Sequence, residues 1–510
     1  SLDRRSTIYS EGSEYSDDLH PYSSDLDIFG KSSLFEMMNR SSTSGGIAKL
    51  AGWLKEPATV AVIRERQAAV LELSTKLAWK HHFQAVLLFA NKAADDQSAE
   101  LLKYLNTSLD RPDPWLKVYV RWVLPVFLIT ALGSWFIPSL LILLSGLIIL
   151  NLILMQSYNS RILKTDSMIG KMSRILDNFS EAILAVRDES WKSAMCRQIT
   201  EDLKGEGEKK LSEQIKRFSL LISHLTFGLT AVGAILNAVM VWNIRQLFAI
   251  EDWKKENHEN LQYAFDVLAS FEALISLSSL NTNYPEWCFA EINEQENYTL
   301  KGRGIGHPLI PLQERVSNDY FLNNSLKIDI ITGSNMAGKS TFLRTLGINT
   351  VLALSGAPSC ALSMEVSRML IFTYMRIRDS LNESTSTFKA ELDRLQALIK
   401  MLDNSGKVYF LIDEMLRGTN SVDKYFGSKA VIEKLIAQNA VGIVATHDLQ
   451  IAGLEQKYPN YIRNYYFDIQ MEADEMKFDY KLKEGECKTF NASLLLQRIG
   501  IYPDNQHQQD

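Results

Sequence analysis

The sequence predicts an α plus α/β protein, in which a helical part is followed by a part with a mostly parallel sheet. Residues 157–217 alternate apolar and charged residues at helical spacing, residues 122–155 carry no charged side chain, and short apolar runs follow near 328–331 and 408–412. Long periodic segments indicate helices, whereas short apolar runs bounded by turn residues indicate buried strands. The expected parts are a polar tail (1–24), a helical domain in two halves (25–117 and 157–290), an apolar hairpin between them (118–156), an α/β domain (291–503) and a second polar tail (504–510).

The helical domain is predicted from an amphipathic segment, a turn and a helix end that follow one another in the sequence. An amphipathic run begins near Leu34, a turn is expected at Gly45, and a helix should end before Pro57. In the second half, Gly205 and Gly207 interrupt the periodic segment as a turn, and residues 251–280 should form one long helix.

The uncharged stretch at 122–155 is the most unusual part of this domain. A membrane span needs about 20 apolar residues, so the stretch is too long for one straight crossing and long enough for two tight ones. Gly133 to Trp135 and Pro138 supply a break near its middle, which predicts a transmembrane helical hairpin. Basic residues flank it on both sides, and by the positive-inside rule both ends face the cytoplasm: Lys117, Arg121, Arg161 and Lys164. The alternative is a buried pair of apolar helices.

A second uncharged stretch, Phe218 to Asn243, contains His224, Asn237 and several glycines. A single crossing there would place the two ends of the chain on opposite sides of the membrane. The stretch is therefore part of a second hairpin that extends toward Ile250, a re-entrant segment or a buried core helix, and its periodicity does not decide among the three.

The α/β domain opens with a glycine-rich loop after the strand-like run at 328–331. The loop fits the pattern G-x-x-x-x-G-K-[ST], in which backbone N–H groups and a helix N-terminus face phosphate oxygens. Lys339 would reach the outer phosphates and Ser340 would bind Mg²⁺. This pattern predicts that the chain binds a nucleoside triphosphate. The expected phosphate-binding residues are Gly333, Ser334, Asn335, Met336, Ala337, Gly338, Lys339, Ser340 and Thr341.

Two later apolar runs end in residues suited to hydrolysis. Residues 408–412 lead into Asp413, which would hold Mg²⁺ together with Ser340, and Glu414, which would orient and polarise the attacking water. A strand near 441–446 delivers His447 to the carboxyl edge of the sheet, where ligands of parallel sheets gather. We expect His447 to sense the γ-phosphate. The alternative is a structural histidine in the core, whose ring nitrogens are hydrogen-bonded within the protein.

These segments, in this order, resemble the ATPase domain of the MutS family. The family pattern reads NMGGKST, STF-x-x-E, DE-x-x-RGT and THD, and resembling segments lie here at 306–309, 333–341, 376–379, 384–391, 413–421, 447–448, 478–485 and 492–503. Residues 33–73 are similar to the start of the family's helical core and lever domain. The resemblance implies a helical MutS-like core and lever domain with an inserted hydrophobic hairpin, followed by an ABC-class P-loop ATPase domain that uses ATP and Mg²⁺.

The resemblance also implies residue roles and partners. The ring of Phe321 would stack on adenine, and the segment with Ser386 and Thr387 would complete the site of a second subunit in a homodimer. DNA is a further partner implied by the family. Ser334 and Ala337 depart from the family pattern, and the alanine requires a negative φ at its position. The amino-terminal module with a Phe-x-Glu wedge, with which repair members read mismatches, is expected to be absent, which puts direct mismatch recognition in doubt.

Composition sets bounds on the remaining possibilities. The 510 residues are 46% apolar, enough for two or three domains, and the net charge of −6 provides no general attraction for nucleic acid. The four cysteines, widely spaced, predict neither a zinc site nor a disulfide framework: Cys196, Cys288, Cys360 and Cys487.

Three functions remain open at this point. The first is a MutS-like ATPase that couples ATP turnover to DNA binding, here anchored to a membrane. The second is a membrane-tethered ATPase switch that acts on a protein partner without mismatch recognition. The third is the nucleotide-binding half of a transporter, which is disfavoured because STSTF stands where such proteins carry Leu-Ser-Gly-Gly-Gln. A soluble cytoplasmic protein remains the alternative to the membrane anchor.

Overall fold

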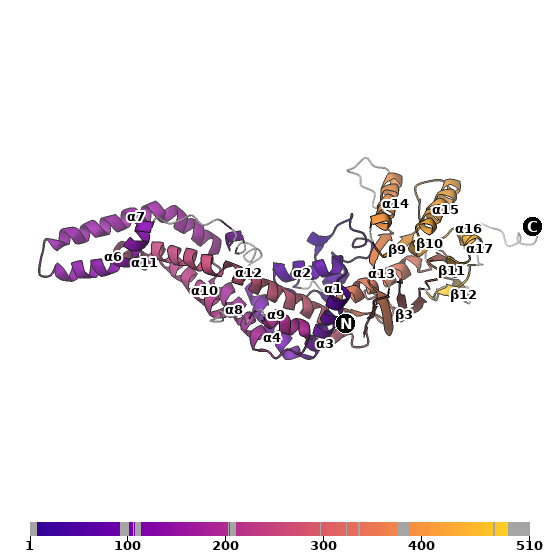
Figure 1. Cartoon of the computed structure of the whole chain (residues 1–510), viewed down its shortest axis with the longest axis horizontal. Helices are drawn as coiled ribbons and strands as arrows, with labels where there is room; N and C mark the ends of the chain where they lie inside the picture. The colour runs from indigo at the N-terminus through magenta and orange to yellow at the C-terminus, as the bar shows by residue number, and fades with distance from the viewer. Residues whose placement is uncertain are drawn as a thin grey trace, which may run out of the picture. The chain divides into compact units, whose positions relative to one another are not determined.

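The computed structural model describes residues 8–91, 101, 103–105, 107, 114–201, 203, 211–295, 297–322, 324–334, 337–375, 387–404, 406–472 and 475–487. The chain divides into two compact units (Figure 1). The first, called the sheet unit below, comprises Ser1–Asn39, Leu50–Thr75 and Ser276–Asp510. The second, called the helical unit, comprises Arg40–Lys49 and Lys76–Ile275. This combination of helical and α/β structure confirms the coarse fold class.

A six-stranded sheet lies at the centre of the sheet unit. Its five longer strands are parallel, and only the short edge strand β14 runs antiparallel to its neighbour. In spatial order the strands are β14 (Lys483–Glu484), β11 (Ile462–Tyr466), β5 (Ile328–Thr332), β10 (Val441–Thr446), β9 (Val408–Asp413) and β8 (Leu370–Tyr374). The other strands form a sheet of β2 (Glu291–Asn293), β7 (Ser363–Ser367), β3 (Leu300–Ile305) and β4 (Asn318–Phe321), the pair β1 (Cys288–Phe289) and β6 (Pro358–Ser359), and the pair β12 (Ile469–Glu472) and β13 (Glu475–Phe478).

Helices cover both faces of the central sheet. Phe410 and Ile412 of β9 pack in a core with residues of α14 and α15, whereas Leu411, which points to the other face, lies against Gly347 of α13. Every residue of β5, β9 and β10 is buried, as expected for parallel strands covered on both sides. The helices of this unit are η1 (Ser13–Tyr15), α1 (Leu34–Met38), α3 (Val60–Thr75), α13 (Lys339–Ser355), α14 (Thr387–Asn404), α15 (Ser421–Ala437), α16 (Leu449–Ala452) and α17 (Leu454–Lys457).

A buried charge pair links three strands of this unit. Asp329 of β5 is fully buried and accepts hydrogen bonds from Arg463 of β11 at 2.9 and 3.0 Å and from the Tyr320 hydroxyl at 2.6 Å. Burial raises the pKa of Asp329, and the hydrogen bonds and charge of Arg463 act against that rise. The carboxylate is thus compensated by its partners rather than by water.

Arg463→Met should destabilise the sheet unit by about 3–5 kcal/mol, because it leaves Asp329 as a buried charge without its partner. The double change Asp329→Leu with Arg463→Met removes both charges and should recover part of the loss. Denaturant titration followed by circular dichroism measures both. A single variant no less stable than the double variant would show that the pair does not matter.

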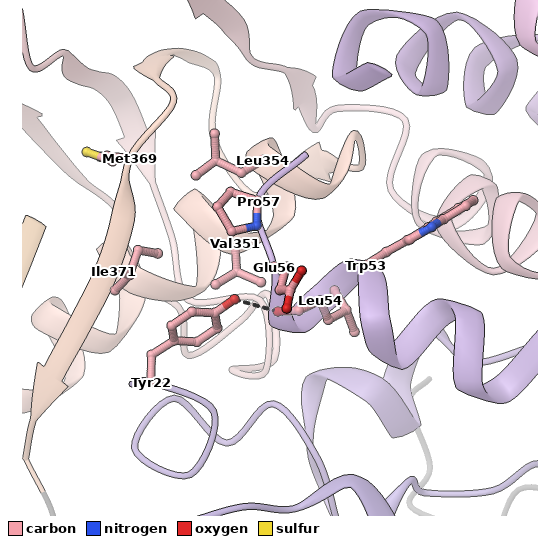
Figure 2. A pocket seen from close by; sticks show the side chains of 9 residues that line it. All are labelled: Tyr22, Trp53, Leu54, Glu56, Pro57, Val351, Leu354, Met369 and Ile371. Carbon is pink, nitrogen blue, oxygen red and sulfur yellow. Dashed lines mark hydrogen bonds between the residues drawn. The ribbon is translucent and has the colours of Figure 1, made fainter. Parts of the chain in front are cut away.

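The described part of the predicted amino-terminal tail is packed, which corrects the expectation of a polar tail up to residue 24. Tyr22 is buried, and its hydroxyl donates a hydrogen bond to the Leu54 carbonyl at 2.8 Å (Figure 2). The Pro21 carbonyl accepts hydrogen bonds from Thr373 of β8 and Arg394 of α14. Composition could not reveal these partners, because they lie far away in the sequence. The gap beside Tyr22 in Figure 2 has a volume of about 10 Å³, room for no more than one water.

The helical unit is built around the long helix α12, which confirms the single helix expected over 251–280. Aromatic side chains form part of its core: the rings of Trp79 and Trp191 lie 4.9 Å apart, and Trp191 lies 4.9 Å from Phe271. Two of the boundaries between the units fall within α2 and α12. The helices are α2 (Ser44–Lys55), α4 (Leu77–Asn91), α6 (Pro114–Gly133), α7 (Leu140–Ile169), α8 (Ser173–Asp188), α9 (Ala194–Glu201), α10 (Leu211–Phe227), α11 (Ala231–Met240) and α12 (Trp242–Asn283).

Helices α6 and α7 pack against each other (Figure 1). Both expose apolar side chains. Among the described residues, three helical segments are long and apolar enough to cross a membrane: α6, α7 and Glu259–Asn283 of α12. The apolar window of the α12 segment is 72% buried within the protein, compared with 22% in α6 and 11% in α7. The α12 segment is therefore a core helix, whereas α6 and α7 present their side chains outward.

Candidate nucleotide site

The glycine-rich loop joins β5 to α13 in the sheet unit. Gly333 and Gly338 have φ values of 144° and 103°, and a side chain at Gly333 would come within 2.6 Å of the Phe467 carbonyl oxygen. Ala337 does not have a positive φ, so its methyl group is compatible with the loop. Asn335 and Met336 lie outside the described residues. The loop ends at the N-terminus of α13, where unpaired backbone N–H groups favour anions.

Two side chains at the start of α13 point back toward the loop and the adjacent strand. Lys339 is buried, and its ammonium group donates hydrogen bonds to the carbonyls of Gly333 at 2.6 Å and Ser334 at 2.8 Å. Burial lowers the pKa of Lys339, and the carboxylates of Glu414 and Asp413 act against this. The Ser340 hydroxyl donates to Asp413 Oδ2 at 2.5 Å. This hydroxyl and carboxylate are the type of oxygen ligands that Mg²⁺ prefers, so the pair fits a magnesium ion.

Glu414 follows β9 and is fixed by three groups. Its backbone N–H donates to the Ala445 carbonyl of β10 at 2.9 Å, and its φ of 54° turns the chain sharply at this point. Oε1 lies 2.9 Å from His447 Nδ1, and Oε2 lies 3.4 Å from Arg417 Nε. Burial acts to raise the pKa of Glu414, but the hydrogen bond with His447 and the charges of His447 and Arg417 outweigh it and lower that pKa. The carboxylate is therefore ionised and oriented.

His447 and Arg417 complete this cluster. His447 follows β10, and its Nε2 lies 3.4 Å from Lys424 Nζ. Arg417 also donates to the Asp413 carbonyl at 3.1 Å, so it contacts both acidic residues. Arg417 lies within the predicted motif at 413–421, but no role was predicted for it from the sequence. Its spacing of three and four residues from the two carboxylates was the available signal.

A cavity of about 570 Å³ adjoins the loop. Gly338, Ser340 and Thr341 of the loop contribute to its wall. The other lining residues are Ile305, His307, Leu309, Ile310, Pro311, Glu314, Val316, Asn318, Phe342, Thr345, Phe467 and Tyr480. A cavity of this size, lined by both apolar and polar side chains, can hold a small molecule.

The Tyr480 ring lies beside the start of α13, where a side chain at Gly338 would meet it at 2.9 Å. Asn318 holds this segment, because its amide donates to the Tyr480 carbonyl at 3.0 Å and accepts from the Leu482 N–H at 2.8 Å. Burial is the main cause that lowers the pKa of His307 to about 4, so this lining residue is neutral at pH 7. Sequence reasoning assigned no role to any of these three residues.

Phe321 is not among the residues that line the cavity. It lies in β4 with its side chain half-exposed, and the Lys301 ammonium is 5.6 Å from its ring centroid. Its role in adenine stacking stays a prediction. Ser386 lies outside the described residues, and Thr387 is the first residue of α14, with a side chain that is also not described. The structure thus brings together Lys339, Ser340, Asp413, Glu414 and His447.

Comparisons with known proteins concern the same part of the chain. Residues 329–503 match the family model described as MutS domain V. The "DNA mismatch repair protein MutS" of Thermotoga maritima is 32% identical over 241 residues, 46% of this chain and 29% of the relative. The protein of the same name from Aquifex pyrophilus is 32% identical over 207 residues, 40% of this chain and 24% of the relative. The chain thus spans less than a third of the length of these relatives.

Proposed function

Because the chain belongs to the MutS family, we propose that the sheet unit binds ATP with Mg²⁺ and hydrolyses it to ADP and phosphate. The observation that carries the proposal is the cluster of Lys339, the Ser340–Asp413 pair and the Glu414–His447 pair next to one cavity. The loop N–H groups and Lys339 would bind the phosphates. Mg²⁺, held by Ser340 and Asp413, would neutralise charge on the phosphoryl group.

Glu414 and His447 are suited to the hydrolytic step. The ionised Glu414 carboxylate, oriented by His447 and Arg417, would accept a hydrogen bond from the attacking water and position it. His447 would respond to the γ-phosphate from the carboxyl edge of β10. We place the base and ribose of the nucleotide in the cavity between the loop and Tyr480. The Tyr480 ring offers a surface on which the base would stack. His307 also lines the cavity and is neutral, so it places no charge beside the base.

A membrane anchor is the second part of the proposal. Many apolar side chains of α6, α7 and the turn between them are exposed, which is unfavourable in water. Among them are Leu128, Ile129, Leu132, Trp135, Phe136, Ile142, Leu143, Ile149 and Ile153. At the other end of the pair, Lys117 lies 2.6 Å from Asp252 and Arg161 lies 3.4 Å from Glu251. These charged groups mark the end that would face the cytoplasm, where the ATPase would also lie.

The family relatives bear the name of DNA mismatch repair proteins, so we propose that DNA is the partner whose binding is coupled to ATP turnover. The exposed apolar pair favours a second candidate, a membrane-tethered switch acting on a protein partner. A DNA titration of the purified chain at several salt concentrations, with and without ATP, separates them. Salt-dependent binding that ATP changes supports the first candidate, and no binding at low salt supports the second.

A homodimer is the assembly we propose, formed at a surface beside the site. Phe388 and Leu392 of α14 and Val422 and Phe426 of α15 are exposed by 37%, 44%, 61% and 61%. Gly418, just before α15, packs against Phe388, so the two helices present these side chains near the loop that carries Glu414. Such exposed aromatic residues are typical of protein interfaces.

If Ser386 acts on the nucleotide of the partner subunit, Ser386→Ala should reduce turnover without weakening nucleotide binding. Mixing Ser386→Ala with Lys339→Ala should then restore some activity, because one hybrid site has an intact loop and an intact Ser386. Phosphate release and nucleotide affinity are measured for each variant and for the mixture. No recovery in a preparation shown to exchange subunits would mean that each site is complete within one chain.

A further inference from the structure

The segment with α10 and α11 adjoins the apolar α6–α7 pair but cannot form a straight span. Residues 218–244 contain no Asp, Glu, Lys or Arg. The two helices meet at 99°, and the ten residues of α11 extend about 15 Å, half of the roughly 30 Å hydrocarbon core of a membrane. The segment could therefore enter a membrane only by turning back within it.

Helix α11 is attached to both α6 and α7 (Figure 1). The fully buried Asn151 of α7 donates hydrogen bonds to the carbonyls of Ala238 at 2.7 Å and Val239 at 3.2 Å, at the end of α11. Its Oδ1 accepts a hydrogen bond from the Tyr119 hydroxyl of α6 at 2.6 Å. Carbonyls at a helix end have no partner within the helix, and in hydrocarbon each unpaired group costs several kcal/mol. Asn151 supplies that partner for the end of α11 from within the helical unit.

Several backbone groups at the turn between α10 and α11 are paired within the protein, whereas the buried Asn243 side-chain amide beside it has no hydrogen-bond partner among the described residues. Asn237 donates to the Gly228 carbonyl at 2.9 Å and accepts from the Asn243 N–H at 2.8 Å. Gly228 has no room for a side chain, because a Cβ atom there would lie 1.6 Å from Asn243 Oδ1. The Thr230 side chain caps α11 by accepting from the Gly233 N–H. Irregular backbone at membrane depth needs this kind of pairing within the protein.

The outward side of α11 is apolar. Val232 and Ile235 of α11 are 59% and 66% exposed, and Phe227 and Leu229 beside the turn are 45% and 40% exposed. They extend the apolar surface of α6 and α7, which has no charged side chain between Trp122 and Met155. A lipid hydrocarbon phase that covers α6 and α7 would therefore cover α11 as well.

We propose that residues 218–240, which comprise α10 from Phe218 onward together with α11, form a re-entrant element, which enters the same bilayer as α6 and α7, contacts acyl chains through Val232 and Ile235, and returns to the side it came from. Asn151 is the residue that docks it. This inference rests on the proposed membrane anchor. It implies that Arg217 before the element and Arg245 after it lie on the same side as the sheet unit.

The test uses single cysteines that carry an environment-sensitive fluorophore, in the 510-residue chain reconstituted in phosphatidylcholine–phosphatidylglycerol vesicles with spin-labelled lipids. The parent chain gives the background from its native cysteines. Leu143→Cys reports the anchor itself, and Leu71→Cys, 52% exposed in the sheet unit, reports a site in water. Val232→Cys and Ile235→Cys should be quenched by the lipid label to the same degree as Leu143→Cys, whereas Leu71→Cys should not be quenched.

Sidedness is tested with Arg217→Cys and Arg245→Cys and a membrane-impermeant maleimide. Both should react to the same fraction as Leu71→Cys. Adding Asn151→Ala should reduce quenching at Val232→Cys and leave Leu143→Cys quenched. The matched control is Thr130→Ala, which also removes a buried polar group but one that bonds within α6 itself, to the Val126 carbonyl at 2.7 Å.

The possible outcomes separate this inference from the anchor. Quenching at Leu143 without quenching at Val232 and Ile235 would overturn the re-entrant element and keep the anchor. Arg217 and Arg245 reacting from opposite sides would also overturn it, because the segment would then cross. No quenching at Leu143 would overturn the anchor, and the inference with it.

Discussion

Lys339→Ala is expected to abolish tight nucleotide binding, whereas Glu414→Gln should bind ATP and turn it over slowly. Lys339 lies in the loop, where its ammonium group would contact the phosphates of bound nucleotide, so its loss weakens the ground-state complex. Glu414 is fixed by His447 and Arg417 next to the Ser340–Asp413 pair, so its loss affects the step at which water attacks. Removal of a general base or water-positioning group lowers turnover by about 10²- to 10⁴-fold.

Nucleotide affinity by equilibrium titration and phosphate release at saturating ATP distinguish the two effects. Lys327→Ala and Glu433→Gln are matched controls, because both residues lie in the sheet unit and make surface contacts, Lys327 with Asn439 and Glu433 with Lys457. Both controls should bind and hydrolyse ATP like the parent. Equal turnover in Glu414→Gln and the parent would show that Glu414 does not position the attacking water.

Leu143→Arg or Ile148→Arg should move the protein out of the membrane fraction or into aggregates. Either change places a charge on α7 within the uncharged stretch, at a cost of about 2.5–3.5 kcal/mol on insertion scales. Leu71→Arg is the matched control, since Leu71 and Leu143 are equally exposed, each at 52%, and Leu71 lies in the sheet unit. Membrane flotation of the three variants and the parent gives the comparison.

A chain lacking residues 122–155 should be soluble without detergent and still bind ATP, because the site lies in the sheet unit. A parent chain that purifies as a monodisperse protein without detergent would contradict the anchor. In that case the exposed side chains of α6 and α7 would be covered by protein, and the soluble, DNA-binding function would become the better proposal.

Local patterns predicted the parts of the site that are adjacent in sequence. The loop at Gly333, the paired carboxylates at Asp413 and the position of His447 after an apolar strand all follow from short motifs on parallel strands. The sequence could not reveal that Asn318 fixes Tyr480 beside the loop, because the two residues are 162 positions apart. Phe321 was chosen by its place in a family pattern, and it is not among the residues that line the cavity.

The helical unit shows the same limit. The uncharged stretch at 122–155 was visible in composition, and the break near Gly133 followed from its Gly and Pro residues. The sequence did not decide the role of residues 218–243, because an apolar helix has the same periodicity in a core, in a hairpin and in a re-entrant segment. The contact on which the re-entrant proposal rests, between Asn151 and the end of α11, joins residues 87 and 88 positions apart.

The most direct measurement is ATP hydrolysis by the 510-residue chain after flotation with lipid vesicles. The parent chain should float with the vesicles and release phosphate from ATP added outside. Its rate should be at least about 10²-fold higher than that of Glu414→Gln in the same vesicles. Both chains should float equally. A floating parent chain that releases phosphate no faster than Glu414→Gln would contradict a membrane-anchored ATPase of the MutS family that works through this site.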